Sequence, residues 1–317
     1  MNDFESEVQM AYRWILGRSA DPTGIEHYTD CLRSGSLDSS GLRRSLIESP
    51  EFTGGLPGYV VADIGNGLKA VVDPSEPEFG RHIVAGGGWE PHVVEAIRSN
   101  LGLGQTFVDI GGNVGVMSFN AAAVVGARGK VIAFEPNPRN VSAFRRGIVA
   151  NGNNNILLLS LALSDHHHMI GLTSASNAKV LGDASATQEA DVVQAVPGDE
   201  ILEQQSRIDL IKIDIEGYEL PALMGLQKTL VRHKPKILCE FNPLCLRAQG
   251  GIEPNVLADF LFGLTAAVEV VEHDNGRTVV SSSVDLMRLW DQRDGAATAA
   301  GHLPAGWAHL DLLFSVS

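Results

Sequence analysis

Short apolar runs alternate with helix-like segments along the chain from residue 106 to residue 241. The apolar runs lie at residues 106–110, 131–134, 156–161, 208–213 and 236–241. Strands that are apolar on both faces are typical of a parallel sheet whose two sides are covered by helices. At Asn137-Pro138, a capping residue precedes a proline at the first helical position, which indicates the start of a helix. The pattern predicts a doubly wound, mostly parallel α/β sheet.

The first 50 residues show helical spacing only. Their apolar residues fall at helical intervals in three groups: Val8, Ala11, Tyr12 and Ile15, then Ile25, Tyr28 and Leu32, then Leu42, Leu46 and Ile47. Asp21-Pro22 and Gly35 mark the start and the end of the second helix. We predict a helical module over residues 1–54 and a larger domain over residues 55–317. About 50 residues make a marginal core, so we expect the module to pack on the rest of the chain or to support an oligomer.

Acidic residues stand at the ends of most of the predicted strands. They are Asp109, Glu135, Asp165, Asp214 and Glu240. In parallel α/β sheets, ligands bind beyond the carboxyl ends of the strands. Any one of these residues could instead cap the helix that follows it. Their recurrence at successive strands favours a binding site at that edge of the sheet.

The turn after the first of these strands has the sequence Gly-Gly-Asn-Val-Gly over residues 111–115. Because it leads into a helix, its amides form a site that attracts negative groups. The dinucleotide fingerprint G-x-G-x-x-G fails, because Asn113 and Val116 stand where its second and third glycines belong. Asp109, two residues before the first glycine, suits a cofactor with a cationic amino group. Glu135 can accept both ribose hydroxyls, but both cofactor classes use an acidic residue there, so Glu135 alone does not discriminate. The turn therefore favours S-adenosylmethionine over a nicotinamide dinucleotide.

Composition narrows the class of protein further. The formal net charge is −14, a poor match to nucleic acid, for which a basic face is expected. The three cysteines, Cys31, Cys239 and Cys245, have no zinc-site spacing. No apolar stretch approaches the ~20 residues of a membrane span, and the N-terminus lacks the features of a secretory signal. We expect a cytoplasmic protein with no nucleic-acid partner and no membrane span.

Four motifs, in order along the chain, carry a resemblance to a known family. They are Phe107-Val108-Asp109-Ile110-Gly111-Gly112-Asn113-Val114-Gly115, Phe134-Glu135-Pro136-Asn137-Pro138, Ala162-Leu163-Ser164-Asp165 and Ile208-Asp209-Leu210-Ile211-Lys212-Ile213-Asp214-Ile215-Glu216-Gly217. Together with Gly88-Trp89-Glu90-Pro91 and the segment 234–240, they resemble the FkbM family of methyltransferases. The resemblance implies a seven-stranded, Rossmann-like class I methyltransferase sheet and methyl transfer from S-adenosylmethionine to oxygen, commonly a hydroxyl of a sugar or natural product. It also implies that the cofactor is lined by Asp109, Gly111, Asn113, Gly115, Glu135, Asn137 and Asp165.

The chain departs from the usual family residues at two places, and its N-terminal segment carries a second resemblance. The family usually has alanine where Gly112 stands, and it often has a histidine after the acidic residue that corresponds to Glu240, where this chain has Asn242-Pro243. The N-terminal segment, up to residue 52, resembles a bacterial domain of unknown function that often accompanies enzymes acting on surface glycans. These resemblances imply a saccharide or another small molecule as the methyl acceptor.

Asp214 and Glu216 are the leading candidates for the base that takes the proton of a hydroxyl acceptor. They follow the fourth strand at its carboxyl end, and Glu240 at the end of the fifth strand is a third candidate. Lys212 lies in an otherwise apolar strand, points to the same side as Asp214 and needs a carboxylate partner. The alternative is a purely structural pair of Lys212 and Asp214, with Glu216 capping the helix after Gly217.

Other chemistries have weaker support in the sequence. A three-carboxylate magnesium cluster is not visible, and His166, His167 and His168 alternate in direction in an extended chain, so we predict no metal. The span 174–198 is either a lid over the acceptor or a variable loop. An NAD(P)-dependent oxidoreductase is disfavoured by the broken glycine fingerprint, and a non-catalytic scaffold by the intact strand-end carboxylates.

Overall fold

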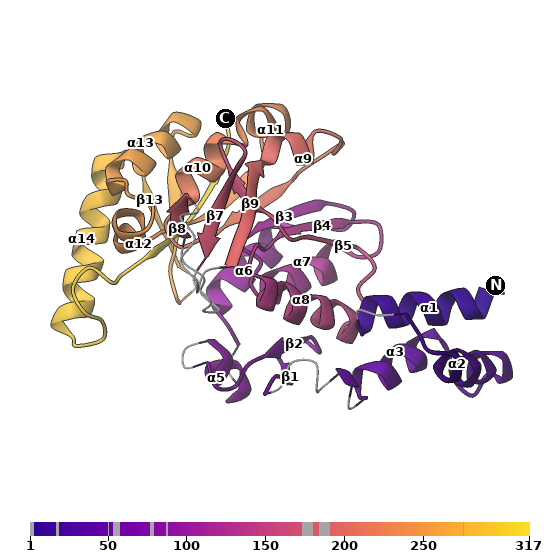
Figure 1. The fold of residues 1–317 in the computed structure, drawn as a ribbon. Helices are drawn as coiled ribbons and strands as arrows, with labels where there is room; N and C mark the ends of the chain where they lie inside the picture. Colours follow the sequence, from indigo (N-terminus) through magenta and orange to yellow (C-terminus); the bar gives the residue numbers. More distant parts are fainter. Residues whose placement is uncertain are drawn as a thin grey trace. The chain divides into compact units, whose positions relative to one another are not determined.

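The computed structural model describes residues 3–16, 19–49, 51–52, 58–76, 79–86, 88–172, 180–183, 191–274 and 276–317 (Figure 1). Contacts between Cα atoms divide the chain into two compact units. The first unit contains residues 1–89, 114–119 and 142–154, and the second contains residues 90–113, 120–141 and 155–317. The domain boundary predicted at residue 54 stays a prediction, because residues 53–57 lie outside the described part.

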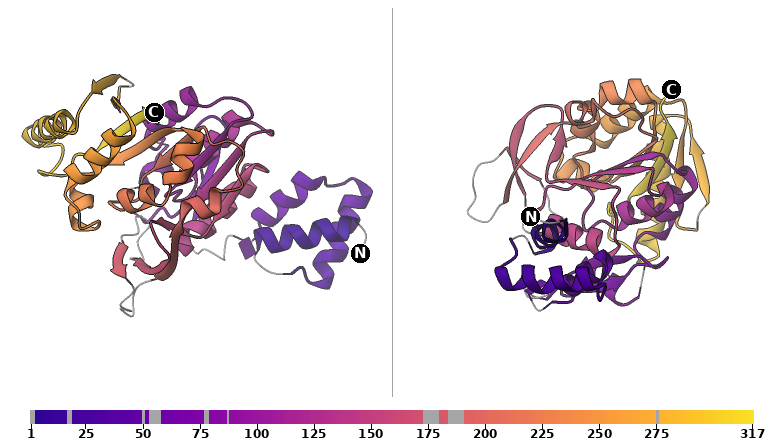
Figure 2. Two further views of the ribbon diagram at one scale, coloured as in Figure 1. Left: turned by 90° about the horizontal axis from the view of Figure 1, so that it is seen from above. Right: turned by 90° about the vertical axis from the view of Figure 1, so that its right-hand side faces the viewer.

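The first unit begins with three helices that pack on one another as a bundle (Figure 2). They are α1 (Asp3–Ile15), α2 (Pro22–Ser34) and α3 (Ser39–Ile47). The predicted ends of α2 are confirmed: the Asp21 side chain accepts a hydrogen bond from the Gly24 amide at 2.9 Å, and Gly35 ends the helix at φ 72°. A left-handed backbone at this position favours glycine, which has no Cβ to clash.

The helices share an apolar core within this unit. Val8, Leu42 and Phe52 are buried in it, and Val149 of α8 (Pro138–Ala150) packs against it. The guanidinium of Arg146, also on α8, lies 4.0 Å from the ring centroid of Phe52 and donates to its carbonyl. The module is thus tied to α8 by apolar and cation–π contacts. The unit also contains the antiparallel pair β1 (Val60–Asp63) and β2 (Lys69–Val72), and the helix α5 (Phe79–Val84).

The second unit is built on an eight-stranded sheet, counted over the described part of the chain. In spatial order its strands are β13 (Arg277–Val280), β12 (Val268–Val271), β14 (Leu310–Ser315), β11 (Lys236–Phe241), β10 (Leu210–Ile213), β3 (Thr106–Ile110), β4 (Lys130–Phe134) and β5 (Ile156–Leu159). The strands from β11 to β5 pair in parallel, and β14 lies antiparallel between β11 and β12. The predicted doubly wound, mostly parallel fold is confirmed. β13 adds an antiparallel edge strand to the seven that were predicted.

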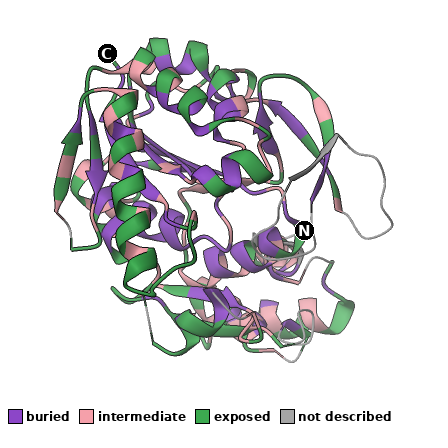
Figure 3. Cartoon of the chain, turned by 90° about the vertical axis from the view of Figure 1, so that its left-hand side faces the viewer, coloured by how far each residue is buried: buried purple, intermediate pink, exposed green. Residues whose placement is uncertain are grey.

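Helices precede and connect the strands of this sheet. Besides α8 they are α6 (Pro91–Asn100), α7 (Val116–Val125), α9 (Gly198–Leu202), α10 (Glu219–Met224), α11 (Gln227–His233), α12 (Pro243–Ala248), α13 (Pro254–Leu264) and α14 (Ser283–Ala299). Buried residues concentrate on the strands and on the inner faces of the helices (Figure 3). The core includes Val108, Ile213 and Phe241 of the sheet together with Leu223 of α10 and Leu257 of α13. None of the described helices is long and apolar enough to cross a bilayer.

A second, smaller sheet corrects one part of the sequence interpretation. Its strands are β6 (Ala162–Ser164), β9 (Asp191–Pro197), β7 (His168–Leu172) and β8 (Val180–Asp183), in that order. The apolar run 156–161 was expected to be one strand, but β5 ends at Leu159 and the chain then enters the second sheet through β6. Asp165 therefore follows a strand of the second sheet, because an apolar run does not specify which strand it pairs with. Within the span 174–198, predicted as a lid or a variable loop, residues 180–183 form β8, residues 191–197 form β9 and Gly198 begins α9, and the other residues lie outside the described part.

Candidate active site

A buried lysine contacts oxygen atoms at the carboxyl ends of two neighbouring strands, β10 and β3. Lys212 of β10 is 5% exposed, and its Nζ lies 3.1 Å from Asp214 Oδ2 and 3.8 Å from Asp109 Oδ1. The same Nζ donates to the carbonyl of Gly111 at 3.1 Å. The Gly111 carbonyl and Asp214 lie within hydrogen-bonding distance of Nζ, whereas Asp109 at 3.8 Å contributes as a nearby opposite charge. The carboxylate partner predicted for Lys212 is observed.

The charges of this group depend on one another. Burial would lower the pKa of Lys212, but the carboxylates of Asp214, Asp109 and Glu90 outweigh burial and raise it. Lys212 is therefore cationic at any ordinary pH and compensates the charge of Asp109, which is fully buried. Removing one partner of a buried ion pair leaves an uncompensated charge, which is costly.

The glycine turn is fitted closely to the loop after β10. Gly111 has φ 82°, and a Cβ on it would collide with the carbonyl oxygen of Asp214. The amides of Gly111 and Gly112 both donate to the carbonyl of Phe134 at 3.0 Å. Only glycine meets both demands at residue 111, a left-handed backbone and close approach. Gly115 belongs to the first unit, where it has φ 99° and its Cα faces the ring of Phe144.

Glu135, at the end of β4, accepts hydrogen bonds both from the glycine turn and from the start of the next helix. Its Oε2 accepts from the Asn113 amide at 2.7 Å, and its Oε1 accepts from the Asn137 amide at 2.8 Å. Asn137 itself caps α8, accepting from the amide of Arg139 at 2.9 Å, as its position before Pro138 predicted. Burial raises the pKa of Glu135 to about 7, although the hydrogen bonds from Asn137, Asn113 and Asn140 oppose the shift. The two carboxylate oxygens have about four lone pairs, so the amides leave acceptor capacity for ligand hydroxyls.

The loop after β10 holds a different cap from the one considered in the sequence. Glu219, which is fully buried, accepts from the amides of Ile215 and Gly217, each at 3.1 Å. Glu216 instead adopts φ 57° and accepts from Cys245 Sγ at 3.2 Å. Glu219 therefore closes the loop.

Glu240, at the end of β11, lies among other carboxyl groups. Burial raises its pKa well above the usual value, and Asp214, Glu219 and Glu216 raise it further by repulsion. Its Oε2 is shielded from solvent and has no hydrogen-bond partner among the described residues. Burial and the neighbouring carboxylates therefore favour the neutral form of Glu240. Its role as a base stays a prediction.

Asp165 and the three histidines form a network beside this loop. Asp165 Oδ1 lies 2.7 Å from His166 Nδ1 and accepts from Ser164 Oγ at 3.1 Å. His168 Nε2 lies 3.1 Å from the hydroxyl of Tyr218. Each histidine has a protein partner, since His167 contacts Glu200 at 2.9 Å. Among the described residues, no three His, Cys, Asp or Glu side chains are arranged to hold a metal ion.

The structure adds residues that the sequence interpretation missed. Glu90, just before α6, lies close enough to Asp214 and Asp311 for their charges to act on it. His92 of α6 is 2% exposed, and its Nε2 lies 2.8 Å from Asp311 Oδ2 on β14. The signal for Glu90 was present in the motif Gly88-Trp89-Glu90-Pro91, but nothing local connected that motif with residue 311.

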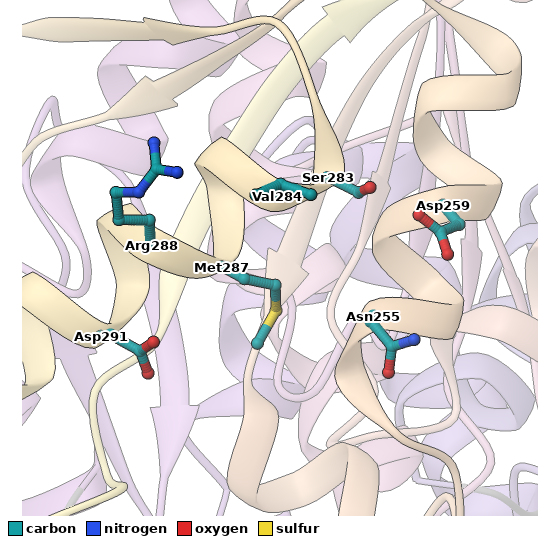
Figure 4. Close-up of a pocket in the computed structure, with 7 residues that line it drawn as sticks. All are labelled: Asn255, Asp259, Ser283, Val284, Met287, Arg288 and Asp291. Atoms are coloured by element: carbon teal, nitrogen blue, oxygen red, sulfur yellow. The ribbon is translucent and has the colours of Figure 1, made fainter.

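The hollow drawn in Figure 4 lies elsewhere in the second unit. It has a volume of about 490 Å³ between α13 and α14, and the side chain of Met287 projects toward it (Figure 4). None of the predicted site residues lines it. Its charged lining groups include Arg288, which is paired with Asp285 at 2.7 Å. The chemistry of the chain is therefore concentrated at the sheet edge.

The sheet order, the glycine turn after β3 and the acidic residues after β4 and β10 define a class I S-adenosylmethionine-dependent methyltransferase fold. Residues 109–249 match the Methyltransferase FkbM domain. Residues 109–249 are thus a methyltransferase domain of the FkbM type, whose methyl donor is S-adenosylmethionine. The predicted family and cofactor are confirmed.

Known proteins show more distant similarity. The hexuronic acid methyltransferase AglP of Haloferax volcanii is 23% identical over 169 residues, which cover 52% of this chain and 64% of that protein, less than two thirds of its length. A methyltransferase FkbM from Methylobacillus flagellatus KT is 15% identical, with 99% of this chain and 61% of that chain covered and a TM-score of 0.37. A putative rRNA-methylase from Clostridium thermocellum is 12% identical, with 71% and 96% covered and a TM-score of 0.41. At these TM-scores, no functional conclusion follows from the two structures.

Proposed function

We propose that this protein transfers a methyl group from S-adenosylmethionine to a hydroxyl oxygen of a sugar or another small molecule. The observation that carries the proposal is the joint arrangement of the glycine turn, Glu135 and the Lys212–Asp214 pair within the FkbM-type domain. The name of the Haloferax relative, a hexuronic acid methyltransferase, supports a saccharide acceptor. We keep a cytoplasmic location and a domain boundary near residue 54 as predictions from the sequence.

The residues present fit the cofactor in two respects. The side-chain oxygen of Asn113 is buried and has no hydrogen-bond partner among the described residues, which suits a ligand donor. Glu135 retains acceptor capacity for ribose hydroxyls. We assign cofactor-lining roles to Asp109, Gly111, Asn113, Gly115, Glu135, Asn137 and Asp165.

Methyl transfer from a sulfonium centre is an in-line displacement that requires an aligned acceptor oxygen. The bound cofactor supplies an electrophilic methyl group and a neutral thioether as the leaving group. Asp214 and Glu216, in the loop after β10, are our leading candidates for the base that takes the proton of the acceptor hydroxyl. Lys212 holds Asp214 in one direction through its 3.1 Å contact.

The decisive experiment is calorimetric titration of the full-length protein with S-adenosylhomocysteine, beside Glu135→Gln. We expect micromolar binding that weakens about tenfold or more in the variant, which corresponds to about 1.4 kcal/mol. Glu95→Gln, an exposed position on α6, is the matched control and should bind as the unmodified protein does. Absence of binding to any of the three proteins contradicts the methyltransferase function.

The acceptor is then sought with isotope-labelled methyl donor. Neutral sugars, amino sugars and uronic acids serve as probes, and the position of the label is read by mass spectrometry. Label on a hydroxyl oxygen supports the proposal. Label found only on nitrogen or on a carboxylate of these acceptors shows a different acceptor group.

A further inference from the structure

The tip of the loop after β10 has a backbone that is unusual for the residue it carries. Glu216 has φ 57° and Gly217 has φ 101°. The amide of Tyr218 donates to the carbonyl of Ile215 at 3.4 Å, which closes a four-residue turn. Two positive φ angles in succession belong to a mirror-image β-turn, whose central positions favour glycine, asparagine and aspartate. A glutamate at the first central position is therefore held there against its backbone preference.

A neighbouring helix packs directly on this turn. A Cβ on Gly217 would collide with the carbonyl oxygen of Cys245 on α12, and a Cβ on Gly250 would collide with the carbonyl oxygen of Gly217. Asn242 caps α12, because its Oδ1 accepts from the Cys245 amide at 3.2 Å. The position of Cys245 beside the turn is thus fixed by close backbone packing and by the start of its own helix.

The side chain of Cys245 reaches the carboxylate at the tip of the turn. Its Sγ donates to Glu216 Oε2 at 3.2 Å, and Gln249 Nε2 at the end of α12 donates to Sγ at 3.6 Å. The two hydrogen bonds run in one direction, from the amide through the thiol to the carboxylate. Burial and the Glu216 carboxylate raise the pKa of the Cys245 thiol. The sulfur therefore keeps its proton and remains a donor to Glu216.

The two leading candidates for the base are held by different kinds of donor. Asp214 contacts the ammonium of Lys212 at 3.1 Å. Protonation of Asp214 would remove one of the two carboxylates that compensate this buried charge, which is costly. Glu216 accepts from a thiol, which is a weak and uncharged donor. Such a donor directs the carboxylate, and protonation of Glu216 breaks no ion pair with it.

Resting on the proposed function, we propose that Glu216 accepts the proton of the acceptor hydroxyl and that Cys245 is the positioning residue that directs its carboxylate. In this step, a lone pair of the acceptor oxygen forms the bond to the methyl carbon, and the carbon–sulfur bond breaks with its electrons left on sulfur. The hydroxyl proton moves to a carboxylate oxygen of Glu216, so charge and atoms balance. The proton later leaves to solvent.

The first experiment measures the contact itself and needs no acceptor. In the full-length protein carrying Cys31→Ala, labelling of Cys245 by iodoacetamide is followed against pH by peptide mass spectrometry. We expect Glu216→Gln, which removes the negative charge beside the thiol, to move the midpoint of labelling to lower pH. Glu95→Gln, an exposed position on α6, is the matched control. An unchanged midpoint in Glu216→Gln overturns the inference.

The second experiment measures catalysis with labelled methyl donor and with glucose, glucosamine and glucuronic acid as probes. We expect Cys245→Ala to lower kcat about tenfold or more and to change KM of the sugar less than about threefold, because a misdirected base acts on the transition state. The acidic midpoint of the kcat profile should move to higher pH, since the ionised carboxylate has lost a donor. Cys245→Ser keeps a donor and should restore both values. Cys31→Ala, in the first unit, is the cysteine control.

The outcomes separate this inference from the proposed function. Absence of S-adenosylhomocysteine binding to the unmodified protein overturns the methyltransferase function and this inference together. Binding without transfer to any probe overturns the proposed acceptor class and the inference that rests on it. Transfer that is the same in Cys245→Ala as in Cys31→Ala overturns the inference alone. A loss of kcat that Cys245→Ser does not restore makes Cys245 a packing residue and also overturns it.

Discussion

Two groups of buried charges lie at the same edge of the sheet, and they are balanced in opposite ways. Around Lys212, one cation meets two carboxylates and a carbonyl oxygen within 3.8 Å. Around Glu240 and Glu90, carboxyl groups face other carboxyl groups, and burial raises the pKa of both. Burial alone therefore does not decide whether a group is ionised. The charge of the neighbouring group also decides whether a buried group is ionised, since an opposite charge favours the ionised form and a like charge favours the neutral form.

The largest effect is expected from Lys212→Met, which removes the cation from the balanced group. Asp109 is fully buried and would be left without compensation. Breaking a buried pair in this way costs about 3–5 kcal/mol of the free energy of unfolding. Urea denaturation of the full chain measures it. A loss smaller than about 1 kcal/mol, the range of exposed ion pairs, would show that this group is not the balanced centre inferred here.

A smaller effect is expected in the pH dependence of stability. The folded-state pKa of Glu90 is about 8 against its usual 4.5, so the folded protein binds more protons than the unfolded chain between these values. Stability then falls as pH rises through this window. Glu90→Gln should make the slope of unfolding free energy against pH less negative between pH 4.5 and about 8. Glu95→Gln is the control, and identical slopes in the two variants contradict the shift.

The smallest effect is expected from Glu240→Gln, which replaces the carboxyl by a neutral amide of similar shape. Because burial and the neighbouring carboxylates raise the pKa of Glu240 and so favour its neutral form, the free energy of unfolding should change by no more than about 1 kcal/mol. The same denaturation experiment measures it beside Lys212→Met. A loss as large as that of Lys212→Met would mean that Glu240 is ionised and paired, and the contrast between the two groups would fail.

Local sequence patterns predicted strand bounds and helix ends correctly where these depend only on residues that are neighbours in the sequence. β3 and β11 have the bounds predicted from their apolar runs, and α2 begins at Pro22 and ends before Gly35 as predicted. Both results depend on neighbours within a few residues: burial on two faces for the strands, and backbone conformation for the caps. The pairing of Lys212 with Asp214 followed equally from their spacing of two along one strand.

Such local patterns did not predict contacts between segments that are far apart in the sequence. The split of the run 156–161 between two sheets depends on which strands stand beside it. The choice of Glu219 over Glu216 as the loop cap depends on backbone directions at Ile215 and Gly217. Glu90 was visible only as part of a motif, because its neighbours Asp214 and Asp311 are far from it in sequence.

The sequence by itself determined the fold class, the family and the cofactor, since apolar periodicity, turn residues and strand-end motifs are local properties of the chain. The tertiary structure alone decided that Asp109 shares the cation of Lys212 with Asp214, and which carboxyl groups face one another. The physical reason is that a pKa depends on burial and on charges within a few ångströms in space. Here those charges come from β10, β14 and the start of α6, which only folding brings together.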